Sequence, residues 1–347
     1  MEHSPPSERL SGHVVAIGVG SAGCRITSQL RTLSKSLGYA VFVSSAAEDV
    51  PTLSNTRAVV VETGSVRPVG PAQLRSKAEN HRIELEQLVR GARAVLVVSG
   101  LGGVVGSTLS PWVAGVADAM GAATLAIVLM PFRFERHKHF EAALALRRLR
   151  RSCDGVVVVD NEELVGQLGE IPAVEAFARV NQHIAVAIDR LLASQNPSHV
   201  GVGLQKLLQL TEDGRYAILS LANAASLEMT EEAVRQAVEA VYRTCQPDRI
   251  DRVVLLLEGE GTPTTAELAT SANHIRSRLG GGSVQLEYGI FRGKNFGGAT
   301  AVLLAAGFAQ TKFDRYDPLS VVLSGPVLDD APESSLNIEL PRVVLLD

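Results

Sequence analysis

Short apolar runs and segments with helical spacing alternate along the chain, and their order predicts the fold. Residues 14–17 and 94–98 are continuously apolar, which is typical of buried strands. Each run is followed by a glycine-rich turn and then by helical spacing, over residues 24–33 and 111–120. Strand and helix patterns alternate in this way to about Asn196. We therefore predict an α/β protein that begins with a doubly wound parallel sheet.

The pattern changes in the second half of the chain. Residues 174–194 have the spacing of one long helix, and strands and helices are mixed from Ala217 onward. The strands expected there are residues 252–258, 284–291 and 299–306, and the helices are residues 230–244 and 264–279. We therefore predict a second, smaller domain of mixed α/β type.

Composition and charge limit the classes of function. At 347 residues the chain is longer than one core usually serves, so more than one domain is expected. A net charge of −4, a pI of about 6.1 and an aromatic content of 4% predict no nucleic-acid partner. Cys24, Cys153 and Cys245 lie far apart, so we expect a cytoplasmic protein with neither disulfide nor metal site. Without a signal peptide or a long apolar run, we expect no direct membrane insertion.

Two glycine-rich turns carry the candidate chemistry. Gly18, Gly20 and Gly23 fit the spacing GxGxxG between a strand and a helix, and residues 99–108 form a second turn of small residues. Backbone amides in such turns point inward where the helix dipole is positive, which suits phosphate. The two turns predict one nucleotide held from two sides. Either turn alone also fits plain close packing of strand and helix, and the second lacks a Walker Gly-Lys-Ser/Thr.

The order of these motifs identifies a resemblance. The first turn, then residues 100–108 with Pro111, then Pro-Phe-Arg-Phe-Glu at residues 131–135, resembles the bacterial cell-division protein FtsZ and its tubulin relatives. In that family the second turn reads GGGTGTG, and Pro-Phe-x-Phe-Glu follows at this distance. The similarity covers residues 12–308. It implies that the long helix joins a nucleotide-binding domain to the smaller domain, and that the ligand is GTP or GDP, with Mg²⁺ only if GTP binds.

The resemblance also implies the residues that contact the nucleotide. Glu135 and Asn161 match ribose contacts, Phe177 can stack on the base, and Asn181 can pair with the edge of guanine. The full predicted set is Gly18, Gly20, Ser21, Ala22, Gly23, Arg25, Gly102, Gly103, Gly106, Ser107, Thr108, Glu135, His139, Asn161, Phe177 and Asn181. Other interpretations stay open, because Phe177 also suits a core, Glu135 a surface charge and Arg25 a solvated helix position. His137 and His139 flank Lys138 at poor metal spacing, so we expect solvated side chains there.

Departures from the family pattern predict a weaker phosphate site. Val104 stands where the family has glycine, and Val105 stands where it has threonine. A valine restricts the backbone and places methyl groups where phosphate oxygens belong, while the change from threonine removes a hydroxyl donor. We therefore expect GTP binding to be weak or absent.

The loop that completes hydrolysis in the family also departs from its pattern. There, the loop after the long helix reaches the nucleotide of a neighbouring subunit with an Asn-x-Asp-x-x-Asp segment. Aligned on Pro197, these three positions are Gly201, Gly203 and Lys206, so no carboxylate remains. Glu212 and Asp213 follow only after a helix-like stretch. Because each positioned acid or base contributes roughly 10²–10⁴ to a rate, we predict no catalytic residue here and little or no GTPase activity.

The predicted function is that of an FtsZ/tubulin-like cytoskeletal protein, a filament subunit or filament partner. We expect head-to-tail self-association or pairing with an active relative, with Val202 and Leu204 available for a standing contact. The alternatives are an active filament-forming GTPase of cell division and a Rossmann-type oxidoreductase. The predicted divisions are a flexible arm (1–11), the nucleotide-binding domain with its connecting helix (12–196), the degenerate catalytic loop and helix (197–216), the C-terminal domain (217–310), a linker (311–335) and a tail peptide for a partner (336–347).

Overall fold

One ten-stranded sheet organises the part of the chain that the structure describes. The computed structural model describes residues 13–52, 57–64, 69–166, 171–193, 200–211, 216–224, 230–245, 250–259, 261–279, 284–293 and 299–315. The sheet order is β3-β2-β1-β4-β5-β6-β7-β10-β8-β9. Its strands are β1 (His13–Val19), β2 (Tyr39–Ser44), β3 (Arg57–Val60), β4 (Ala92–Gly100), β5 (Ala123–Met130), β6 (Gly155–Asp160), β7 (Tyr216–Ala224), β8 (Arg252–Gly259), β9 (Gln285–Arg292) and β10 (Ala299–Phe308).

The strands from β3 to β7 pair in parallel, whereas β10 runs antiparallel to both β7 and β8. The parallel β6–β7 pair, with Val156 opposite Tyr216, joins the two predicted domains into one continuous sheet. The α/β fold class, with a parallel sheet followed by a mixed one, is confirmed. The domain boundaries stay a prediction.

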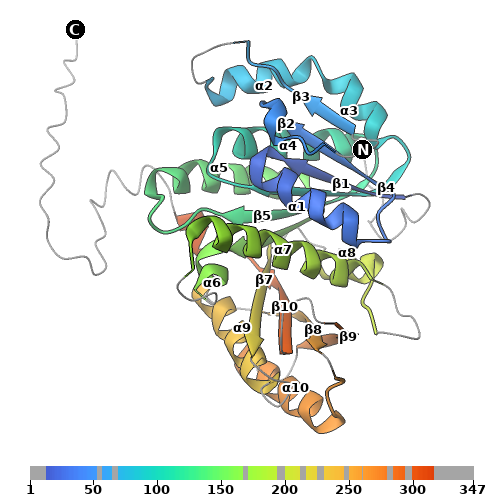
Figure 1. Cartoon of the computed structure of the whole chain (residues 1–347), viewed down its shortest axis with the longest axis vertical. Coiled ribbons are helices and arrows are strands. Elements are labelled where there is room, and N and C mark those ends of the chain that lie inside the picture. The colour runs from blue at the N-terminus through green and yellow to red at the C-terminus, as the bar shows by residue number, and fades with distance from the viewer. Residues whose placement is uncertain are drawn as a thin grey trace, which may run out of the picture.

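Helices cover both faces of the sheet. They are α1 (Gly20–Leu33), α2 (Pro71–Glu79), α3 (Arg82–Val89), α4 (Val104–Ala119), α5 (Arg136–Ser152), α6 (Asn161–Val165), α7 (Ala173–Leu192), α8 (Leu204–Thr211), α9 (Thr230–Thr244) and α10 (Thr265–Leu279), with short 3-10 turns η2 (Ala47–Asp49) and η4 (Lys312–Arg315). Figure 1 shows α7 crossing the middle of the molecule, with the β1–β6 part above it and α9 and α10 below.

Alternation along the strands explains this layering, because successive side chains point to opposite faces. In β1, Val15 and Ile17 belong to one core cluster, whereas Val14 and Ala16 belong to another. The first cluster is closed by α2, α3, α4, α5, α9 and α10, and the second by α1, α7 and α8. The central strands are therefore buried on both faces, as a doubly wound sheet requires.

The predicted elements of the second half are confirmed within two residues, but two helix starts were misplaced. Helix α1 begins at Gly20 rather than at residue 24, and α4 begins at Val104 rather than at Pro111. Both helices start inside their glycine turns, since the Gly103 carbonyl already accepts the Ser107 amide at 3.0 Å. Among the described helices, none combines the length and apolar character needed to cross a bilayer.

Candidate functional site

The two glycine turns meet at the carboxyl edge of the parallel strands, as predicted. Gly20 has a φ of +68°, which favours glycine. A Cβ added to Gly20 would lie 3.4 Å from the Gly106 nitrogen and 3.5 Å from Cγ1 of Val105. The turns are therefore nearly in contact, and Val105 is one of the groups that narrow the space between them.

Close packing alone requires several of the motif glycines. A Cβ on Gly18 would lie 2.5 Å from the Gly23 carbonyl oxygen, and one on Gly23 would lie 2.2 Å from that of Val98. At Gly106 the corresponding distance to the Gly100 oxygen is 2.0 Å. These contacts are with backbone, which cannot swing aside as a side chain can. The glycines at these three positions are thus needed by the fold whether or not a ligand binds.

The electrostatics of the turns still suit an anion. Helices α1 and α4 both begin at these adjoining turns, and no side chain forms a hydrogen bond at their N-caps, Val19 and Gly103. The positive ends of both helix dipoles therefore lie close together. Not every backbone amide of the turns is available to an anion, however, because the Gly102 amide donates to the Ser107 hydroxyl at 2.8 Å. Ser107 is buried, so this amide is already paired inside the protein.

Phenylalanine rings mark the place predicted for the base. Phe177 on α7 is 41% exposed, and its ring centroid lies 5.4 Å from that of Phe132. Phe132 also stacks on Phe134 at 5.4 Å, with the ring planes 8° apart. Phe177 is therefore neither a core residue nor fully solvated. Asn181, one turn further along α7, is buried, and Arg25 on α1 is exposed.

Glu135 is held by contacts within its own loop. Its carboxylate accepts the Phe132 amide at 3.1 Å and pairs with the Lys138 ammonium. Burial raises the pKa of Glu135, but the bonds from Lys138 and from the Phe132 amide outweigh it, so the pKa lies below its usual value. The carboxylate is therefore charged at neutral pH and shapes the turn that leads into α5.

The expectation that His139 is solvated was wrong. Only His137 is exposed, whereas His139 is 3% exposed. Its Nε2 lies 2.9 Å from the Phe132 carbonyl oxygen, and its ring stacks on Phe313 at 6.3 Å. Burial lowers the pKa of His139, which keeps the ring neutral near pH 7. Sequence spacing alone misplaced this residue because Phe313 comes from a segment that is remote in the chain.

Asp160 is a buried polar hub that the sequence analysis missed. It ends β6 and accepts the Glu162 amide at 3.1 Å and the Thr244 hydroxyl at 3.3 Å. It also pairs with the Lys312 ammonium, so one carboxylate joins β6, α6, α9 and η4. An aspartate closing a run of four valines was the available signal. Its neighbour Asn161 has a buried Oδ1 to which no described residue donates, so this predicted contact keeps a vacant acceptor.

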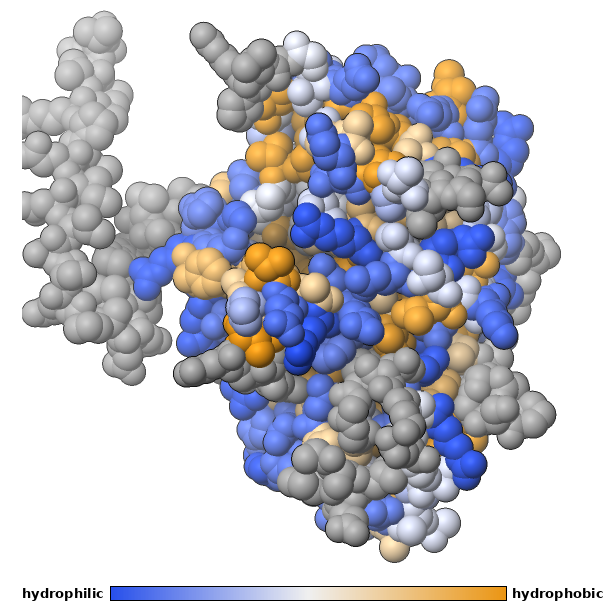
Figure 2. Space-filling view, in the orientation of Figure 1, coloured by the Kyte–Doolittle hydropathy of each residue, from blue (hydrophilic) through white to orange (hydrophobic). Residues whose placement is uncertain are grey.

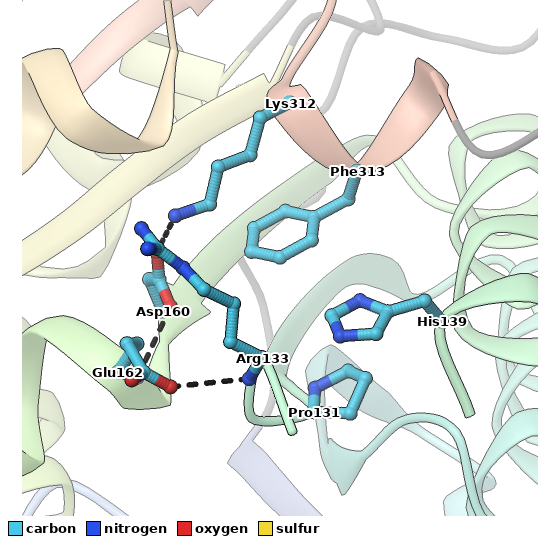
Figure 3. Close-up of a pocket in the computed structure, with 7 residues that line it drawn as sticks. All are labelled: Pro131, Arg133, His139, Asp160, Glu162, Lys312 and Phe313. Atoms are coloured by element: carbon cyan, nitrogen blue, oxygen red, sulfur yellow. Dashed lines mark hydrogen bonds and ion pairs between the residues drawn. The ribbon is translucent and has the colours of Figure 1, made fainter. Parts of the chain in front are cut away.

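A cavity of about 100 Å³ adjoins this hub. Figure 3 shows Lys312 reaching down to Asp160, with the rings of Phe313 and His139 beside it and Pro131 below. The Arg133 backbone nitrogen donates to Glu162 at 3.1 Å and closes the opposite side. The cavity is lined by Pro131, Arg133, His139, Asp160, Glu162, Lys312 and Phe313. Among the described residues, no three His, Cys, Asp or Glu side chains gather as metal ligands would.

The remaining predicted contacts lie in the first turns of the two helices. Ser21 and Ala22 are half-buried at the start of α1, and Thr108 is buried in α4. Gly103 is exposed. These positions thus flank the turns as predicted, and their role as ligand contacts stays a prediction.

At the other end of α7 lies the loop predicted to be degenerate. Val200 forms an antiparallel bridge with Ile290, with N–O distances of 3.0 and 2.9 Å, which holds the loop against β9. Lys206 lies 2.6 Å from the Glu287 carboxylate. Leu204 is 7% exposed and packs in the core, so the expectation that it offers a surface contact was wrong. Pro197, Glu212 and Asp213, the arm and the tail peptide lie outside the described residues.

Known proteins resemble this chain in sequence and in fold. Residues 13–169 match the model of the Tubulin/FtsZ family, GTPase domain. Cell division protein FtsZ 1 of Pyrococcus abyssi is 25% identical over 239 residues, which are 67% of this chain and 64% of that protein. An empty FtsZ dimer from M. jannaschii superposes with a TM-score of 0.73 at 21% identity, covering 86% of this chain and 89% of that one. CetZ2 from Haloferax volcanii, a GTPγS-bound protofilament, gives 0.69 at 20%, covering 90% and 99%.

These findings confirm the predicted resemblance to the FtsZ/tubulin family, at the low identity expected of a divergent member. The solved structures establish the fold over most of the chain. The sequence match spans less than two thirds of the Pyrococcus protein.

Proposed function

We propose that this chain, whose residues 13–169 match the GTPase-domain model of the Tubulin/FtsZ family, is a filament subunit or a filament partner with weak or absent GTP binding and hydrolysis. The observation that carries the proposal is the loop after α7. Residues 200–211 contain no carboxylate, and Lys206 stands at the position of a predicted acid with its charge paired to Glu287. A cation in this place neither accepts a proton from water nor polarises it for attack.

Weak nucleotide binding is supported by the other end of α7. Val105 and Gly106 lie against Gly20, and Ser107 already accepts the Gly102 amide. A phosphate entering this space displaces an internal hydrogen bond and meets valine methyl groups. The two uncapped helix ends and the exposed face of Phe177 favour binding, so we expect reduced affinity rather than a change of ligand class.

Assembly depends on different features from turnover. Association follows from the area and complementarity of an interface, whereas turnover needs the missing acids. A head-to-tail contact between unlike surfaces that does not close on itself gives an open filament. The solved relatives include a dimer and a protofilament, which supports assembly by this fold.

Two measurements on the full chain test the proposal. Calorimetry with GTP, GDP and NAD should give no sub-micromolar binding, and phosphate release should stay near background. Sub-micromolar GTP binding with ordinary turnover would instead support the active GTPase, and tight NAD binding would support an oxidoreductase.

Restoring the two acids to the loop tests whether turnover is low because the carboxylates are missing or because the subunits do not stack in the required geometry. Gly203→Asp with Lys206→Asp should raise phosphate release only if the stacked geometry is retained. Gly203 has a φ of +81°, a region that aspartate tolerates better than most residues. Gln205→Asp, which adds an acid at an exposed neighbouring position, is the matched control and should change nothing.

A further inference from the structure

An exposed apolar surface lies beside the glycine turns. It consists of Phe134, Phe177 and Val174, which are 76%, 41% and 83% exposed, and we call it the phenylalanine patch. Phe132 contacts both other rings, and Val174 lies one helical turn before Phe177 on α7. Figure 2 shows apolar side chains among polar ones toward the left-hand end of α7. Side chains of this size exposed together are typical of an interaction surface.

The described chain ends close to this patch. Phe313 in η4 is 2% exposed and stacks on His139, whose Nε2 lies 2.9 Å from the carbonyl oxygen of Phe132. Arg147 of α5 donates to the Asp314 carbonyl at 2.9 Å, which fixes η4 along the same helix. The segment that follows Arg315 therefore starts about one helix length or less from the patch, since α5 spans about 25 Å.

Charge favours contact between α5 and the residues after Arg315. Helix α5 carries six basic side chains and one acidic one, Glu141. Residues 316–347 carry six acidic side chains and one basic one, Arg342. Oppositely charged surfaces of this kind steer an encounter and fix its orientation.

We propose that the apolar end of the chain, residues 343–346 (Val-Val-Leu-Leu), docks on the phenylalanine patch of the same molecule. The 27 residues between Arg315 and residue 343 span at most about 90 Å, several times the length of α5. A tether of this length keeps the segment at an effective concentration on the order of millimolar near the patch, which favours it over a second molecule in dilute solution. The docked segment covers Phe134 and Phe177.

Crosslinking within the full chain tests this docking. Arg136→Cys places a thiol at an exposed position next to Phe134, and Asp347→Cys places the second thiol beside the docking segment. With a short bismaleimide at low protein concentration, we expect a crosslinked monomer to form. Leu345→Asp with Leu346→Asp in the same chain keeps the tether and removes the apolar contact, and should slow the reaction about tenfold. Single-cysteine chains measure the background from the native thiols.

One substitution in the phenylalanine patch and one control substitution outside it make the test specific. Phe134→Ser should slow the crosslink as much as the leucine changes do. Ile83→Ser, at a side chain of α3 that is 71% exposed outside the patch, should leave it unchanged. Both replaced side chains are largely exposed, so neither change should impair folding. Equal crosslinking rates in all chains would show that the two thiols meet only because the chain links them, without docking. A crosslinked dimer in place of the monomer would show that the patch binds another molecule. Either result overturns the proposal.

Discussion

The two ends of α7 have diverged in different ways. At the carboxyl edge of the parallel strands, the glycine turns keep the family spacing but fill the space with Val105 and an internal Ser107–Gly102 bond. At the other end, the Val200–Ile290 bridge holds the loop against β9, and glycine (Gly203) and lysine (Lys206) occupy the two positions where acids were expected. One end thus has the glycine spacing of a phosphate-binding motif, whereas the described residues of the other, 200–211, contain no carboxylate.

The difference shows what a glycine motif indicates. Gly18, Gly23 and Gly106 lie against backbone atoms, so the packing of strands on helices preserves them without any ligand. The loop after α7 is held to β9 by backbone bonds between Val200 and Ile290, so the fold does not require a carboxylate on this loop. The motif glycines therefore indicate the fold, and the loop charges indicate the activity.

The largest expected effect tests whether packing alone requires these glycines. Gly106→Ala places a Cβ 2.0 Å from the Gly100 oxygen, so β4 and α4 must separate, and we expect a loss of about 3 kcal/mol or more in unfolding free energy. Gly103→Ala, where nothing lies within 4 Å, should cost at most about 1 kcal/mol. Urea unfolding followed by Trp112, the single tryptophan, measures both. Equal stabilities would contradict the packing explanation.

The sequence predicted the fold well because spacing and motif order carry it. The apolar runs and helical segments correspond to the observed strands and to α7, α9 and α10. The two helix starts were missed because glycine-rich turns look like loops when the tertiary contacts that hold them are invisible. The sequence also located Phe177 and the glycine turns on neighbouring elements.

The details of the site depend on distant partners, which spacing does not reveal. His139 is buried because Phe313 covers it, and Asp160 is satisfied by Lys312 from 152 residues further along the chain. Leu204 was expected to offer a surface contact because the loop keeps apolar residues, whereas it begins α8 and packs in the core. In each case the deciding neighbour lies far away in the sequence.

The second prediction concerns the space between the two glycine turns, which Val105 narrows. Val104→Gly with Val105→Thr removes methyl groups near Gly20 and adds a hydroxyl donor, and we expect GTP affinity to rise about tenfold, roughly the value of one hydrogen bond to a charged group. Val105→Ala separates the two causes, since it adds room without a donor. Competition with a fluorescent GTP analogue measures the change. An unchanged affinity in the double variant would show that other residues limit binding.

The third prediction concerns the contribution of His139 to the pH dependence of stability. Burial lowers the folded-state pKa of His139, so its contribution to stability is complete above the unfolded value near 6.5 and is lost as pH falls from there toward the folded pKa. We expect unfolding free energy to fall by about 1 kcal/mol between pH 7.5 and 5.5, and His139→Gln to reduce that dependence. His137→Gln, at the exposed neighbour two residues before, is the control and should keep the wild-type slope. Identical slopes in all three proteins would exclude this role for His139.

The smallest expected effect concerns the ion pair between Lys206, in the loop after α7, and Glu287. The Lys206 and Glu287 side chains are 35% and 33% exposed, and ion pairs so exposed contribute at most about 1 kcal/mol and weaken with salt. A double-mutant cycle of Lys206→Gln and Glu287→Gln should therefore give a coupling energy below about 1 kcal/mol that shrinks in high salt. The Val200–Ile290 bridge, which is backbone, is unaffected by either change. A coupling of several kcal/mol would mean that the pair holds the loop in place, and the loss of the acid would then follow from a structural requirement. A small coupling would show that the fold does not require this ion pair, and therefore does not require lysine at this position.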